Sequence, residues 1–87
     1  MLNPEQYEQL SGLIAKTKET ATEVRTLYLN QTEEQSTYRS NSTEYNQTRD
    51  IALTLADAWV ELTDAATALE ALRLRLTKQP AEPVTII

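Results

Sequence analysis

Two tyrosines and two arginines lie close together in the middle of the chain, at Tyr38, Arg39, Tyr45 and Arg49. Tyrosine rings and guanidinium groups together recognise nucleotide bases, phosphates or acidic peptides, because the rings stack and the guanidinium donates paired hydrogen bonds to anions. These four residues are therefore a candidate surface for a small, nucleotide-like anion or for a partner. In the alternative interpretation, the tyrosines stabilise the end of a turn and the arginines are simply solvated.

The side chains that most often perform catalysis are missing. The sequence has no histidine, no cysteine and one glycine, so it lacks the common general base, the thiolate nucleophile and a phosphate-binding glycine loop. Asp50, Asp57, Glu61 and Asp64 follow one side of a predicted helix, as metal-binding carboxylates do in helical bundles, but such sites usually include histidine. We interpret these carboxylates as a solvated acidic face. We expect no enzymatic activity, no metal and no cofactor.

The charge and hydropathy patterns exclude further classes of protein. Eight Lys and Arg residues stand against thirteen Asp and Glu, which gives a net charge of −5. Nucleic-acid binding needs clustered cations, so the balance argues against it. The longest apolar runs are a few residues, too short to cross a membrane. No secretory signal precedes them, so a soluble protein that is cytoplasmic or virion-associated is expected.

Two long amphipathic helices must position these residues. Apolar side chains that recur every three or four residues line one side of an α-helix. In the first half of the chain this row is Tyr7, Leu10, Ile14, Ala21, Val24 and Tyr28. In the second half it is Ile51, Leu55, Ala58, Leu62, Ala65, Leu69, Leu72 and Leu76. The predicted fold is all-α, an antiparallel, coiled-coil-like helical hairpin.

The ends of the helices have recognisable signals. Asn3 before Pro4, with Gln6 three residues after Asn3, indicates a capped helix start. Asn41 and Ser42, followed by Glu at 44, indicate a second start, and Pro80 ends the second helix. We predict a hairpin over 1–79, with helices at 4–39 and 43–78, a turn at 40–42 and an extended tail at 80–87. A mobile loop over 31–48 is the alternative for the polar middle of the chain.

A turn near Asn41 also predicts which residues face each other. It sets Ile14 opposite Leu69 and Ala21 opposite Leu62, and it brings Lys18 near Asp64 and Arg25 near Asp57. The two apolar rows are out of phase by one heptad position, which disfavours a single continuous helix.

A second row on the later helix suggests assembly. It consists of Ala52, Ala56, Trp59 and Ala66. Small residues beside a large aromatic suit close packing by further helices, so we predict an oligomer interface here and a four-helix bundle or larger oligomer. The β-branched end of the tail is a candidate docking segment for another protein. Its residues are Val84, Thr85, Ile86 and Ile87.

Three functional hypotheses follow. The first is a small non-enzymatic interaction protein that self-associates and binds a partner macromolecule, as an adaptor, inhibitor or assembly factor. The second is a protein that sequesters a nucleotide-like small anion, such as a phage or mobile-element accessory factor. The third is a structural or scaffolding rod.

Overall fold

The first helix begins at the predicted capping residues. The Asn3 side-chain oxygen accepts a hydrogen bond from the Gln6 backbone N–H at 2.8 Å, and the Gln6 side-chain oxygen accepts one from the Asn3 backbone N–H at 3.0 Å. Pro4 occupies the first turn, where a missing N–H costs nothing. This reciprocal capping box satisfies two backbone donors that the helix itself leaves free.

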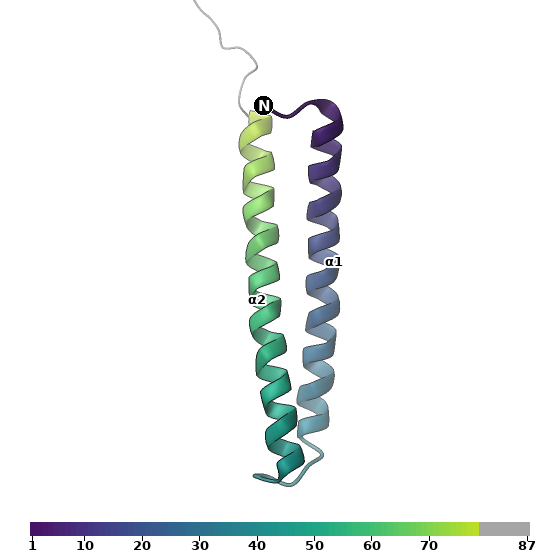
Figure 1. The fold of residues 1–87 in the computed structure, drawn as a ribbon, viewed down its shortest axis with the longest axis vertical. Helices are drawn as coiled ribbons and strands as arrows, with labels where there is room; N and C mark the ends of the chain where they lie inside the picture. Colours follow the sequence, from purple (N-terminus) through teal and green to yellow (C-terminus); the bar gives the residue numbers. More distant parts are fainter. Residues whose placement is uncertain (79–87) are drawn as a thin grey trace, which may run out of the picture.

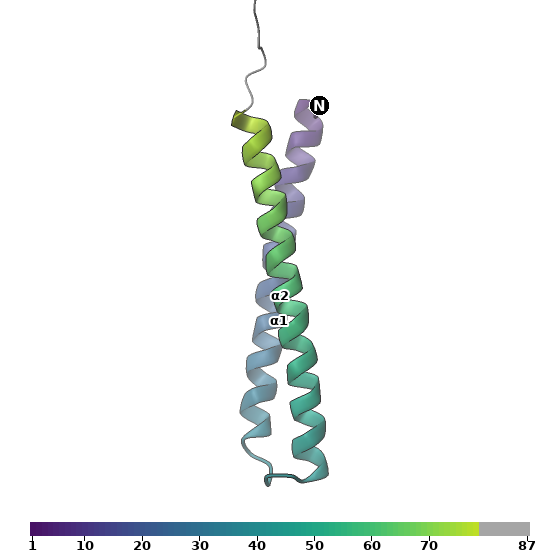
Figure 2. The same cartoon turned by 90° about the vertical axis from the view of Figure 1, so that its left-hand side faces the viewer.

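The chain folds into a helical hairpin, as predicted. A computed structural model describes residues 1–78, with α1 at Pro4–Gln35 and α2 at Thr43–Lys78. The two helices run antiparallel and lie side by side along their length (Figure 1), and they cross at a shallow angle when the molecule is turned by 90° (Figure 2). A helix of 36 residues is about 54 Å long, so the hairpin is a thin rod.

The first helix ends four residues earlier than predicted, at Gln35 rather than at 39. The Ser36 and Thr37 hydroxyls each donate to a carbonyl three residues back, at Glu33 and Glu34, both at 2.6 Å. The Thr37 and Tyr38 backbone N–H groups also donate three residues back, to Glu34 and Gln35, so the α-helical pattern of bonds four residues back has ended here. The turn therefore spans 36–42. The alternative of a loop over 31–48 is wrong, because helix covers both ends of that range.

The direction of the chain reverses at Asn41, which has a φ of 66°. Asparagine tolerates this left-handed conformation better than most residues. The Ser42 hydroxyl then accepts a hydrogen bond from the Tyr45 backbone N–H at 3.1 Å and caps α2. The start of α2 at Thr43 coincides with the predicted one.

The face that α1 turns toward α2 is the predicted apolar row. Leu10, Ile14 and Ala21 are buried, and Tyr7, Val24 and Tyr28 are partly buried. Toward the loop the interface becomes polar. Gln31 and Gln35 are partly buried there, and on α2 Thr48 is buried, with its hydroxyl donating to the Glu44 carbonyl at 2.7 Å.

The face that α2 turns toward α1 agrees with the predicted row only in part. Six residues of that row are partly buried, namely Leu55, Ala58, Leu62, Leu69, Leu72 and Leu76, but the most deeply buried apolar residues lie outside it. Ala52 and Ala66 are buried, with 3% and 4% of their surface exposed, whereas Ile51 is 50% exposed and Ala65 is also exposed. Two apolar rows lie next to each other on this helix, and periodicity alone does not tell which one faces inward. Alanines against α1 leave room for the two backbones to lie close together.

Candidate interaction surfaces

The predicted ligand cluster lies at the loop end of the hairpin. Tyr38 and Tyr45 are partly buried, while Arg39 is exposed in the loop. The Tyr38 hydroxyl donates to the Glu34 carboxylate at 3.0 Å. This hydrogen bond, together with the negative charges of Glu34 and Glu44, raises the pKa of Tyr38 above its ordinary value of 10.0.

The second arginine of the cluster also faces a carboxylate. Arg49 lies 3.6 Å from Asp50 (Nε to Oδ1), with both side chains largely exposed. The structure thus brings the two tyrosines and two arginines to one end of the molecule, but Tyr38 and Arg49 are each engaged with an acidic side chain. An anion entering this region would compete with Glu34 and Asp50.

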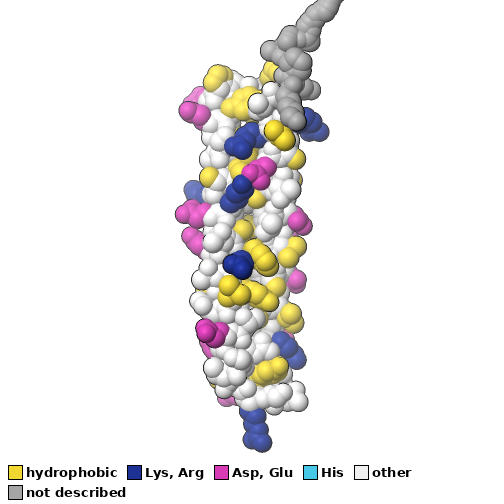
Figure 3. All heavy atoms as spheres, turned by 180° about the vertical axis from the view of Figure 1, so that it is seen from behind, with side chains coloured by type: hydrophobic (Ala, Val, Ile, Leu, Met, Phe, Trp, Pro, Cys, Tyr) yellow, Lys and Arg dark blue, Asp and Glu magenta, His cyan; other side chains and the backbone are white. Residues whose placement is uncertain are grey.

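Three side-chain contacts connect the helices along one face, here called the polar face. Arg73 Nη1 donates to the Ser11 hydroxyl at 3.3 Å, and Lys18 forms an ion pair with Glu70. These contacts come from residues that recur every seven positions on α1, at Ser11, Lys18 and Arg25. Figure 3 shows charged side chains along the middle of one face, where the two helices meet.

The third contact of the polar face joins Arg25 to Trp59, with the guanidinium carbon 5.7 Å from the ring centroid. The predicted neighbours of these cations were wrong. Lys18 reaches Glu70 instead of Asp64, and Arg25 lies over Trp59 instead of near Asp57. The carboxylates on the outer side of α2 point away from α1, because α2 presents its alanine and tryptophan row inward.

The predicted oligomer-interface residues therefore belong to the contact between α1 and α2. Ala52 and Ala66 are buried within a single hairpin, and Ala56 and Trp59 are partly buried. Their contribution to an oligomer stays a prediction. The surface still open to a second molecule is supplied by other residues, which the sequence pattern had assigned to the inside or had not singled out.

The face opposite the polar face carries exposed large apolar side chains. Leu13 follows Ser11 by two residues, and Leu27 follows Arg25 by two. Two residues correspond to a rotation of about 200° around the helix, so both leucines lie on the side away from the polar face. Their exposed fractions are 54% and 53%. The same reasoning applies to α2. Leu72 follows Glu70 of the polar face by two residues and therefore lies on the opposite side of the helix, and Ile51 shares its heptad position with Leu72. We call this surface the leucine face. Its members are Leu13, Leu27, Ile51, Ala58, Ala65 and Leu72.

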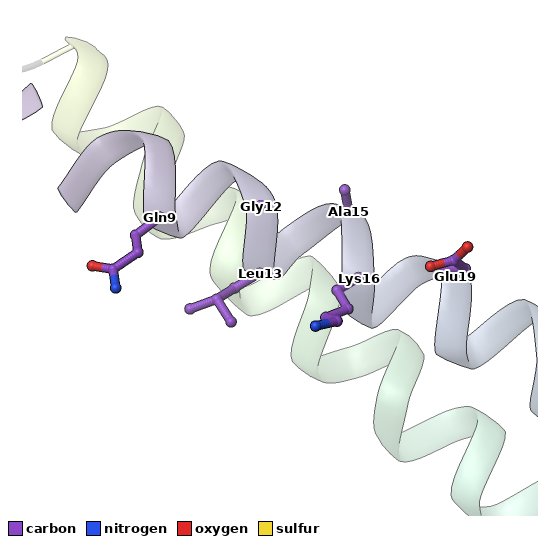
Figure 4. A pocket seen from close by; sticks show the side chains of 6 residues that line it. All are labelled: Gln9, Gly12, Leu13, Ala15, Lys16 and Glu19. Carbon is purple, nitrogen blue, oxygen red and sulfur yellow. The ribbon is translucent and has the colours of Figure 1, made fainter. Parts of the chain in front are cut away.

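A depression lies beside Leu13 on the outer surface of α1. It is lined by Gln9, Gly12, Leu13, Ala15, Lys16 and Glu19. Gln9, Leu13 and Lys16 project from the same side of the helix (Figure 4). A Cβ atom added at Gly12 would meet nothing within 4 Å, so the surface above this residue is open and the depression is shallow.

A second row of exposed apolar residues runs along the outside of α2. Leu53, Val60 and Leu74 are 58%, 51% and 56% exposed, and they share one heptad position. An acidic row lies directly beside them on the same helix. Its members are Asp50, Asp57 and Asp64, all exposed.

Residues 1–78 contain neither a candidate metal site nor a membrane-spanning helix. No group of three or more acidic side chains there is arranged to hold a metal ion. No helix in this part of the chain is long and apolar enough to cross a membrane. The predicted docking segment, Val84 to Ile87, lies outside the described residues.

Comparisons with known proteins found no counterpart. No protein-family model, no curated protein and no solved structure matches the chain.

Proposed function

We propose that this chain is a non-enzymatic helical interaction module that self-associates and binds a partner macromolecule. Its role would be that of an adaptor, an inhibitor or an assembly factor. One observation carries the proposal: the hairpin leaves more large apolar side chains on its surface than it buries.

Only two large apolar side chains of the described residues are buried, Leu10 and Ile14, and the rest of the buried apolar set is alanine. No side chain among the described residues is less than 2% exposed, whereas the exposed set includes Leu13, Leu27 and Ile51. A core this thin supplies little of the free energy needed to order a chain of this length. A second layer of helices on the leucine face would bury the missing apolar area.

The outer row of α2 indicates the chemistry of the partner. Leu53, Val60 and Leu74 offer apolar contacts, and Asp50, Asp57 and Asp64 place negative charge beside them. An amphipathic helix with a basic flank complements both features. The net charge of −5 favours the encounter with such a segment.

The two alternative functions gain less support. To bind an anion, Tyr38 would have to give up its hydrogen bond to Glu34. Arg49 would likewise have to give up its ion pair with Asp50. For a scaffolding rod, the proposed docking segment is the tail, which lies outside the described residues.

Concentration-dependent unfolding tests the self-association. If folding is coupled to assembly, the urea midpoint measured by circular dichroism rises with protein concentration. Leu13→Gln should remove most of this dependence. Leu29→Gln is the matched control, because Leu29 is 44% exposed but lies on a different side of α1 from the leucine face. A midpoint that is the same at every concentration would contradict the proposal.

Partner binding is tested separately with the outer row. Leu53→Gln combined with Val60→Gln should abolish binding of a synthetic basic amphipathic helix while leaving self-association unchanged. Binding by the double variant at wild-type affinity would refute the assignment of this row.

A further inference from the structure

The exposed row on the leucine-face side of α1 has a symmetric order. Leu13 lies seven residues before Thr20 and Leu27 lies seven residues after it. Between them, Lys16 precedes Thr20 by four residues and Glu23 follows it by three. All five side chains are exposed. The two leucines are equally far from Thr20, and the two charged residues are equally far from it to within one residue, with opposite charge.

A two-fold interface requires this kind of order. In an isologous contact, residue i of one copy meets residue j of the other, and j meets i. When two α1 helices pack antiparallel about an axis at Thr20, Leu13 comes level with the partner's Leu27. Lys16 comes within one residue of the level of the partner's Glu23, an offset of about 1.5 Å, so opposite charges lie near each other twice.

The depression on α1 gives this contact a matching shape. Gln9, Gly12, Leu13 and Lys16 stand at positions i, i+3, i+4 and i+7, which are the four corners of a hole in knobs-into-holes packing. The hole is centred at the level that the partner's Leu27 would occupy. Gly12 leaves space in it, because nothing lies within 4 Å of the position of its absent Cβ atom.

The part of the leucine face that lies on α2 has its midpoint at about the same height along the rod as Thr20. The pairs Ser11–Arg73 and Arg25–Trp59 place Ala65 within about one residue of the level of Thr20. The pair Lys18–Glu70 joins two longer side chains and reaches about four residues further along α2. Ala58 and Leu72 lie seven residues on either side of Ala65. An axis at this height sets each Ala58 opposite the partner's Leu72, so that small residues face large ones.

We propose that a second copy of this chain packs antiparallel on the leucine face, with the two-fold axis near Thr20 and Ala65, and forms a four-helix bundle. Leu27 of each copy fills the hole above Gly12 of the other, and Lys16 pairs with Glu23 across the axis. This assignment rests on the proposed self-association and specifies its geometry.

Distances between spin labels test the geometry. The chain has no cysteine, so Thr20→Cys and Asn30→Cys can each be labelled with a nitroxide and measured as the full-length protein. The antiparallel bundle predicts labels within about 20 Å of each other at position 20 and about 30 Å apart along the axis at position 30. Equal distances at the two positions would indicate a parallel dimer and overturn the proposal.

Charge reversal tests the contact itself. Lys16→Glu and Glu23→Lys should each weaken dimerisation about tenfold, because every substitution acts twice in a two-fold dimer. The double variant should recover most of the wild-type affinity. Glu8→Lys, an exposed position outside the row, is the control for a change in net charge.

The outcomes separate this inference from the function on which it rests. A monomer at every concentration contradicts self-association itself. The interface would be refuted, and self-association retained, by either of two results. In one, both single charge reversals leave dimerisation unchanged. In the other, the double variant dimerises as weakly as the single variants.

Discussion

Arg25 lies over the indole ring of Trp59, with its guanidinium carbon 5.7 Å from the ring centroid. This distance is within the range of a cation–π interaction. The contact joins the middle of α1 to the middle of α2 and covers the edge of the tryptophan on the polar face. It accompanies the rotation of α2 that turns the buried Ala52 and Ala66 toward α1.

Removing this contact should loosen the hairpin by a measurable amount. We predict that Arg25→Ala lowers the free energy of unfolding by about 0.5 to 1 kcal/mol and shifts the fluorescence of Trp59 to longer wavelength as water reaches the ring. Arg75→Ala removes the same charge from an exposed position of α2 and should have neither effect. Unchanged fluorescence in Arg25→Ala would contradict the contact.

Gly12 should have opposite effects on folding and on assembly. Glycine inside a helix costs about 1 kcal/mol relative to better helix formers, and the surface above Gly12 is open. Gly12→Gln should therefore stabilise the isolated hairpin, while its side chain fills the hole and weakens dimerisation about tenfold or more. Thr22→Gln, on an exposed part of α1 outside the row, is the control. Tighter dimerisation by Gly12→Gln would be incompatible with the proposed packing.

The left-handed residue of the loop predicts a difference between two small substitutions. Asn41 has a φ of 66°, a conformation that costs alanine about 1 kcal/mol or more but costs asparagine less, because its short polar side chain can hydrogen-bond locally. Asn41→Ala should lower the free energy of unfolding by about this amount, whereas Asn41→Gly should change it by only a few tenths of a kcal/mol. Urea unfolding measures both. Equal effects of alanine and glycine would show that the turn does not depend on this conformation.

The hydrogen bond between Tyr38 and Glu34 predicts a dependence on alkaline pH. The pKa of Tyr38 is raised in the folded chain above 10.0, first by the hydrogen bond to Glu34 and then by the nearby negative charge. The contact therefore stabilises the hairpin below the pKa of tyrosine in the unfolded chain, and this contribution is lost as the pH rises through the raised value.

The Tyr38 titration can be isolated from that of the other tyrosines. The difference in tyrosinate absorbance between the wild type and Tyr38→Phe reports Tyr38 alone. Glu34→Gln should bring the pKa of Tyr38 back toward 10.0, because the charge is removed while an acceptor remains. A titration of Tyr38 that Glu34→Gln does not move would disprove this explanation.

Much of the fold could be predicted from local chemistry. The capping box at Asn3 and Gln6 and the inward row of α1 from Leu10 to Val24 follow from periodicity and from unsatisfied backbone donors. The end of α1 at Gln35 could not be predicted in the same way. The backbone hydrogen bonds change there from four to three residues back. Ser and Thr residues do not mark the change, because threonines inside α1 also bond to backbone carbonyls.

The surfaces were harder to predict than the hairpin. Ile51 and Ala52 are neighbours in two adjacent apolar rows, and only the contact with α1 decides which of them is buried. The seven-residue spacing of Leu13, Thr20 and Leu27 is visible in the sequence. It indicates an exposed row only once Ser11 and Arg25 are known to contact α2. The acidic partners of the polar cluster are close in the sequence, with Glu34 four residues before Tyr38 and Asp50 directly after Arg49, so the sequence did contain the signal that these residues are paired.

The mass of the protein in solution tests self-association most directly. Multi-angle light scattering over a concentration series should show the mass rising from 9.8 kDa to twice that value, with Leu13→Gln remaining at the lower mass. A wild-type mass of 9.8 kDa at every concentration would contradict the account and leave the leucine face without its proposed occupant.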